Sequence, residues 1–168
     1  MVTPKPDLTV GYSYDKITPI RNIAWLYHRK QDFVINNAQI YFPYFLVEVK
    51  TPKGDVTEAL NRLMGDGATC LRLSSQVLPR TMNFVFGTVA TPQWIQLYSI
   101  WQDKSGQIYV ELIEDFSLSK VETYSNCRDA IRKIHEWAAQ VRLPAIFEGL
   151  YQMVKAEEEK VQNRNEEY

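Results

Sequence analysis

The stretch YFPYFLVEVK, residues 41–50, decides how the rest of the chain is expected to fold. From Tyr44 onward its side chains alternate in character, as they do along a β-strand. One side of this strand is wholly apolar and is predicted to lie in the core: Phe45, Val47 and Val49. The other side starts apolar and ends with two opposite charges, Glu48 and Lys50. The strand is therefore predicted to carry a charged group at one end of a buried surface.

A long helix is predicted directly after this strand. Asp55 stands where an N-cap residue is expected, and Glu58 follows three residues later in capping-box spacing. Apolar residues at helical spacing then continue to about Leu78. Gly65 and Gly67 destabilise a helix interior, so they indicate either close packing on a sheet or a break in the helix.

The remaining pattern places strands and helices on both sides of this unit. Before it, the expected elements are a strand at Leu8–Tyr14, a helix at about Pro19–Arg29 and a brief strand at Phe33–Ile35. After it, they are strands at Asn83–Ala90, Trp94–Gln102 and Gln107–Ile113, a helix from Ser125 or Asn126 to about Val141, and a last helix opened by Pro144. This order predicts one α/β domain over residues 1–168 with a mixed central sheet flanked by helices. Its core is expected over about residues 6–115 and its C-terminal helices over about 125–165.

Composition restricts the classes of function. The formal net charge of the 168 residues is -1, whereas a general nucleic-acid coating protein is normally strongly basic. Any contact with nucleic acid must therefore depend on a local basic rim and a metal ion. The sequence shows neither an apolar N-terminal segment nor a run of about 20 apolar residues, which predicts no membrane partner and an intracellular protein, nuclear or cytoplasmic. Cys70 and Cys127 lack metal-ligand spacing and are expected to be buried thiols.

Three charged residues form the candidate site: Asp7, Glu48 and Lys50. Glu48 and Lys50 lie two apart on one strand and so project from the same face. If the strand that follows Asp7 pairs beside this one, the three side chains converge at one end of the sheet. Two carboxylates suit a hard divalent cation such as Mg²⁺ or Mn²⁺, which acidifies a water and neutralises charge on a phosphate. A nearby lysine can stabilise that charge or help to position the water.

At these residues the sequence resembles the PD-(D/E)XK nuclease superfamily. The matching motifs are Pro6-Asp7 and Glu48-Val49-Lys50, within KPDLTVGY and YFPYFLVEVK, and the second block resembles fungal members. The resemblance implies a restriction-endonuclease-like fold and Mg²⁺-dependent cleavage of a nucleic-acid backbone, with DNA favoured over RNA. It also implies that Asp7 and Glu48 are metal ligands, that the Val49 carbonyl is an added ligand, and that Lys50 is the catalytic lysine.

The sequence departs from the family pattern in two respects. A helix and a strand usually precede the Pro-Asp position, but here Asp7 lies almost at the start, which suggests a fragment of a longer protein. The separation of Asp7 and Glu48, 48 − 7 = 41 residues, is also long. Many members carry a polar residue in the helix after the second motif, and Asn61 or Arg62 could fill that role.

Simpler interpretations remain beside this one. Glu48 and Lys50 could form an ion pair on an exposed strand, and Asp7 could be a turn residue. His28 and His135 fit ordinary histidines, and the four tryptophans fit core or partner-facing positions better than base stacking. Two further functions therefore stay open. One is a catalytically silent nuclease-fold domain that acts as an interaction module, and the other is a homodimerisation domain that uses the aromatic strands around Trp94 to Trp101.

Overall fold

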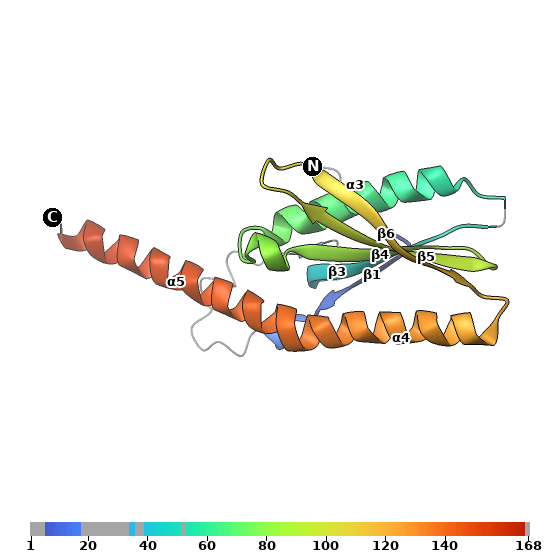
Figure 1. The fold of residues 1–168 in the computed structure, drawn as a ribbon. Coiled ribbons are helices and arrows are strands. Elements are labelled where there is room, and N and C mark those ends of the chain that lie inside the picture. The colour runs from blue at the N-terminus through green and yellow to red at the C-terminus, as the bar shows by residue number, and fades with distance from the viewer. Residues whose placement is uncertain (1–5, 18–33, 36–38, 52, 167–168) are drawn as a thin grey trace.

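The computed structural model describes residues 6–17, 34–35, 39–51 and 53–166, and its central feature is one mixed β-sheet (Figure 1). The strands are β1 (Leu8–Tyr12), β2 (Val34–Ile35), β3 (Ile40–Val49), β4 (Phe84–Ala90), β5 (Trp94–Gln102) and β6 (Ile108–Ser117). The helices are α1 (Tyr14–Ile17), α3 (Val56–Ser74), a short 3₁₀ helix (Arg80–Met82), α4 (Val121–Trp137), a π-helical segment (Ala138–Arg142) and α5 (Leu143–Glu166).

The strands lie in the order β1-β3-β4-β5-β6, and β2 also pairs with β3. Strands β3 and β4 are parallel because α3 crosses over between them, whereas the other pairs are antiparallel. Helix α3 covers one face of the sheet, and α4 with the start of α5 covers the other, while α5 then extends beyond the sheet (Figure 1). The predicted mixed central sheet flanked by helices is confirmed, and it is consistent with a restriction-endonuclease-like α/β fold.

Side chains of β3 point alternately to the two faces of the sheet, and each face has its own hydrophobic core. Leu46 is buried with Leu63, Leu71 and other residues of α3, and Phe45 is buried on the opposite side among residues of α4 and α5. Helix α3 lies so close to the sheet at Gly67 that a Cβ there would collide with the Ile100 side chain. This glycine therefore marks close packing and not a break in the helix.

Several predicted boundaries were wrong. Helix α3 ends at Ser74 and not near Leu78, and a buried hydrogen bond from Asn83 Nδ2 to the Leu71 carbonyl (3.0 Å) satisfies its last turn. Strand β6 continues past the predicted Ile113 because it stays paired with β5 up to Ser117.

The C-terminal helices also differ from the predicted ones in where they begin and how they are joined. Helix α4 begins at Val121, ahead of the predicted caps Ser125 and Asn126, although Lys120 at the N-cap makes no side-chain capping bond. The two predicted C-terminal helices are joined without a loop by the π-helical segment, which precedes Pro144 and accommodates its missing N–H. Val49, expected in the core, is 56% exposed.

Two further expectations concern the first strands. Strand β1 ends at Tyr12 and not at Tyr14, where α1 begins, and the brief strand is seen at Val34–Ile35. The helix expected at about residues 19–29 lies outside the described residues, as does the Asn36-Asn37 pair, which the sequence marks as a turn.

Arg142 joins three parts of the fold from a fully buried position. Its guanidinium donates to the Phe42 carbonyl (2.8 Å), to the Pro43 carbonyl (3.3 Å) and to Ser74 Oγ (3.1 Å). Phe42 adopts a positive φ of 45°, which side-chain-bearing residues rarely adopt, and its carbonyl is one of the three acceptors. Burial holds the pKa of Arg142 below its ordinary value, and the rings of Tyr12 and Tyr44 lie about 6 Å from the guanidinium carbon.

Replacing Arg142 with leucine is expected to destabilise the protein by about 3 kcal/mol or more. Two buried carbonyls and a buried hydroxyl would lose their donor, at about 1–3 kcal/mol for each unsatisfied group. The matched control is Arg132→Leu, because Arg132 is exposed and pairs with Asp129 and Glu136 on the surface of α4, where ion pairs add little to stability. Urea denaturation of both variants measures the difference, and equal losses of stability would contradict the assigned role of Arg142.

Candidate functional site

Pairing of β1 with β3 brings the first two site residues together. Leu8 lies opposite Val47 in this antiparallel pair, so the same register places Asp7 opposite Glu48 and on the same face. Asp7 Oδ2 accepts a hydrogen bond from the Val49 N–H (2.7 Å) and so takes the place of the next backbone acceptor along the ladder. The expectation that the two strands are neighbours in one sheet is confirmed.

Glu48 is the buried member of the pair. Its side chain is 1% exposed, and its Oε1 atom has no hydrogen-bond partner among the described residues. Burial raises the pKa of this carboxyl, and the negative charges of Asp7 and Asp66 raise it further, while Arg62 and Lys50 act in the opposite direction. A buried acceptor without a donor, next to a second carboxylate, is the arrangement that a cation would satisfy.

Lys50 follows β3 directly and is held toward the start of α3. Its Nζ lies 3.6 Å from Glu58 Oε2, and its side chain is 14% exposed. The alternative of an ion pair between Glu48 and Lys50 on an exposed strand does not describe the structure, because Glu48 is buried and the Lys50 ammonium pairs with Glu58. Asp55 caps α3 as predicted, accepting from the Thr57 and Glu58 N–H groups, but the side chain of Glu58 contacts Lys50 and Arg62.

Three charged side chains of α3 border the site: Glu58, Arg62 and Asp66. They are spaced four residues apart, so they lie on one face of the helix. Asn61 and Arg62 are both exposed, but Arg62 pairs with Glu58 and its positive charge lowers the pKa of the Glu48 carboxyl, so Arg62 is the one of the two with an interaction at the site. The sequence analysis missed Glu58 and Asp66 as site residues, although their spacing after a charged strand end was a usable signal.

The donor set suits a hard cation with few protein ligands. Within residues 6–17, 34–35, 39–51 and 53–166, no group of three or more His, Cys, Asp or Glu side chains could hold a metal ion. Asp7 and Glu48 are the two carboxylates that would hold such an ion, and Mg²⁺ is commonly bound through one or two carboxylates. The N–H of Val49 is bonded to Asp7, and a ligand role for its carbonyl stays a prediction.

Other residues singled out from the sequence have structural roles. His135 bonds through Nδ1 to the Tyr44 hydroxyl (3.0 Å) and packs edge-on against Phe45, whereas His28 lies outside the described residues. Cys70 and Cys127 are buried free thiols, as predicted, and burial raises the pKa of Cys70 to about 12. None of the helices in the described part of the chain is long and apolar enough to cross a membrane.

Comparison with known proteins identifies one related family. The model of the family described as "Domain of unknown function (DUF7924)" matches residues 1–150, a range that includes the candidate site and both faces of the sheet. No curated protein matches the sequence, and no solved structure matches the fold.

The raised pKa of Glu48 predicts that a neutral side chain stabilises the metal-free protein. The folded state holds this proton more tightly than the unfolded chain, so the stabilisation is present below the unfolded pKa of about 4.3 and is lost as the pH rises through the folded value. In a chelator, Glu48→Gln should therefore have a higher Tm than the wild type at pH 7, and the difference should disappear below about pH 4.

Circular dichroism melts at the two pH values provide this measurement. Glu122→Gln, on the exposed side of α4, is the control and should show no pH-dependent difference. If Glu48→Gln instead melts lower than the wild type by the same amount at both pH values, the prediction is contradicted. That result would show that the negative charge of the buried Glu48 carboxylate does not destabilise the folded protein.

Proposed function

We propose that the chain, which belongs to the DUF7924 family, is a metal-dependent nuclease that hydrolyses nucleic-acid phosphodiester bonds through Asp7, Glu48 and Lys50. The observation that carries this proposal is the buried Oε1 atom of Glu48, which has no partner among the described residues and lies beside the carboxylate of Asp7. Natural proteins rarely leave such an acceptor unsatisfied without a functional reason.

The charges around this atom support a divalent cation as the missing partner. Four acidic and two basic side chains surround the site, which gives a formal charge of about -2 when all are ionised: Asp7, Glu48, Glu58, Asp66, Lys50 and Arg62. One Mg²⁺ or Mn²⁺ ion would balance that charge. A phosphate would meet a repulsive field without the ion, so substrate binding should depend on the metal.

Each residue has a distinct proposed part in the reaction. Asp7 and Glu48 would hold the ion, which when bound supplies an acidified water and neutralises charge on the phosphate. Lys50 would place its ammonium against the phosphate oxygens and stabilise the negative charge that develops there. Glu58 holds that ammonium near the end of β3, so Glu58 acts on the reaction through the position of Lys50.

The same proposal extends to the type of nucleic acid that is cleaved and to the location of the protein in the cell. The resemblance to PD-(D/E)XK nucleases favours DNA over RNA, and a nuclear or cytoplasmic location would give access to either. The overall charge of -1 argues against broad coating of nucleic acid, so the contact should be confined to the surroundings of the site.

Substitutions at Glu48 and Lys50 separate metal binding from chemistry. Glu48→Ala should weaken Mn²⁺ binding by about tenfold or more and abolish cleavage, because it removes a metal ligand. Lys50→Ala should abolish cleavage but leave Mn²⁺ binding intact or slightly tighter, because it removes a positive charge that repels the cation. Calorimetric titration with Mn²⁺, beside cleavage assays on mixed DNA and RNA substrates, measures both effects.

Lys104→Ala is the matched control, since the exposed Lys104 lies in the turn between β5 and β6 at the other end of the sheet, and it should behave as the wild type in both assays. A Lys50→Ala protein that cleaves as fast as the wild type would disprove the role of Lys50. Metal binding by the wild type without cleavage of any substrate would support the catalytically silent interaction module instead.

A further inference from the structure

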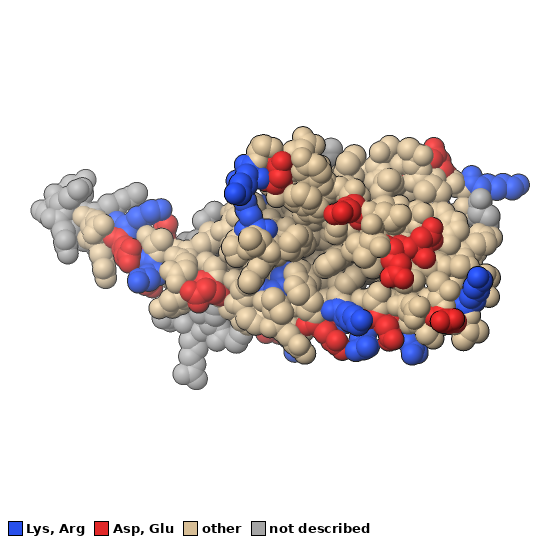
Figure 2. Space-filling model, in the orientation of Figure 1, with Lys and Arg blue, Asp and Glu red and all other residues tan. Residues whose placement is uncertain are grey.

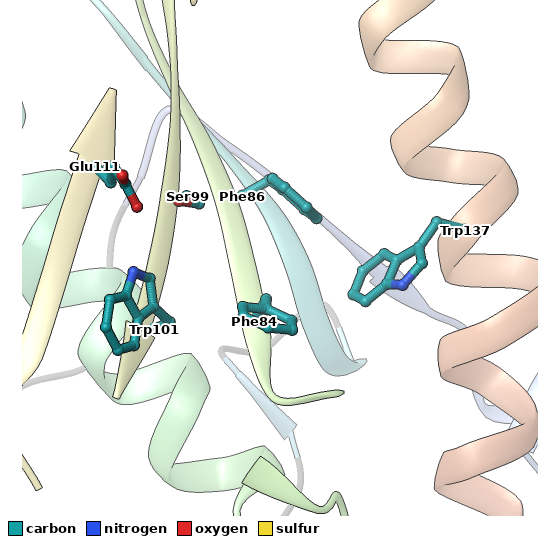
Figure 3. A pocket seen from close by; sticks show the side chains of 6 residues that line it. All are labelled: Phe84, Phe86, Ser99, Trp101, Glu111 and Trp137. Carbon is teal, nitrogen blue, oxygen red and sulfur yellow. The ribbon is translucent and has the colours of Figure 1, made fainter. Parts of the chain in front are cut away.

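A second hollow lies on the other side of the sheet, away from the metal site. It has a volume of about 550 Å³ and is formed by β4, β5, β6 and α4 (Figure 3). The residues that line it are Phe84, Phe86, Ser99, Trp101, Glu111 and Trp137. Phe84 lies at the start of β4, whereas Glu48 pairs near the end of β4 and faces α3, so the two sites occupy opposite ends and opposite faces of the sheet.

Four of the six lining residues are aromatic and are held in place by their neighbours. Trp101 stacks on Tyr109 with ring centroids 4.6 Å apart, and Phe86 meets Trp137 edge-on at 5.4 Å. Figure 3 shows Phe84 and Phe86 between the two tryptophans, with Trp137 on the helix side and Trp101 on the strand side. These rings are half-buried, so the hollow presents aromatic surface that is open to solvent on one side.

The one charged lining residue, Glu111, makes the hollow electronegative. Glu111 lies opposite Ser99 across the β5–β6 pair, and its exposed carboxylate makes no hydrogen bond or ion pair with the residues that the structure describes. Strand β6 carries two further acidic residues, Glu114 and Asp115, and Figure 2 shows several acidic side chains on the face of the molecule that it presents. Aromatic rings carry negative charge on their faces, so the rings and the carboxylate attract the same kind of ligand, a cation with apolar substituents.

We propose that this hollow binds a methylated lysine side chain of a partner protein. An alkylated ammonium suits both aromatic faces and a carboxylate, and it loses less hydration on entering than a bare ammonium. The volume exceeds that of the cationic group alone and the hollow is open, which fits a side chain that remains attached to a peptide. Strand β6, the last strand of the sheet, has no neighbour on its outer side in the described part of the chain, so an extended peptide could pair along it.

Peptide binding tests the proposal directly on the full chain. A peptide of about ten residues with one trimethyl-lysine is titrated by tryptophan fluorescence beside two matched peptides. One carries unmodified lysine and the other the uncharged tert-butyl analogue of trimethyl-lysine. The trimethyl-lysine peptide should bind at least about tenfold more tightly than both, because only it combines a charge with apolar substituents.

Substitutions assign the binding to the hollow. Trp101→Ala should weaken binding by roughly 2- to 30-fold, the range of a cation–π contact, whereas Trp101→Phe should retain part of it. Glu111→Gln should weaken binding of the charged peptide and leave any binding of the tert-butyl peptide unchanged. Tyr124→Ala, at an exposed aromatic residue of α4 outside the hollow, is the control and should bind as the wild type.

Three outcomes would overturn the proposal in folded protein. Equal binding of the charged and tert-butyl peptides would show an apolar groove without preference for a cation. Binding of free choline as tight as that of the peptide would show that the ligand is a small molecule and not a protein segment. No binding of the trimethyl-lysine peptide at millimolar concentration would show that the hollow does not take this ligand.

Discussion

Arg142 is a cation that the fold buries without a carboxylate partner among the described residues. A buried guanidinium is unfavourable unless its donors are satisfied, and here two backbone carbonyls and a serine hydroxyl accept from its two terminal nitrogens, while Nε has no partner among the described residues. The acceptors come from the start of β3 and the end of α3, while Arg142 itself lies between α4 and α5. The two helical layers and the central strand therefore meet at one side chain. Their mutual positions cannot change without leaving charged or polar groups unsatisfied in the core.

This arrangement gives β3 a fixed point at each end. Arg142 holds the beginning of the strand, and the bond from the Val49 N–H to Asp7 closes the ladder at its end. Helix α3 is anchored at its own end through Ser74, and its close approach at Gly67 sets the distance to the sheet. Rigid supports of this kind allow a site to keep two carboxylates near each other although they repel.

Local patterns accounted for much of the fold and for the candidate site. The alternation in β3 placed Glu48 and Lys50 on the side of Leu46, and Asp55 marked the start of α3, because both signals depend only on nearby residues. The pairing of Lys50 with Glu58 was not predicted. The sequence pattern had assigned the Glu58 side chain to a capping box with Asp55, and that role would have kept it from pairing with Lys50. The true start of α4 was missed because polar residues later in the helix looked like better caps than Lys120.

Long-range features lay beyond any local pattern. Arg142 contacts residues about 100 positions away in the chain, and nothing near it in sequence indicates burial. The aromatic hollow likewise combines three strands and a helix, and the alternation of each strand shows only that some aromatic residues share a face. Such features arise from the order of the strands, which hydrophobic periodicity does not determine.

The position of Asp7 depends on how β1 pairs with β3, and Gly11 lies at an irregular point of that pairing. The β1–β3 pairing is irregular between Val10 and Tyr12, and a Cβ at Gly11 would come within 2.8 Å of the Tyr41 carbonyl oxygen. The absence of a side chain there lets β1 lie against β3 with Asp7 facing Glu48. A slip of one residue in this pairing would turn every side chain of β1 to the opposite face. The two carboxylates would then lie on different sides of the sheet, so the site depends on the register of a strand whose close approach at Gly11 leaves no room for a side chain.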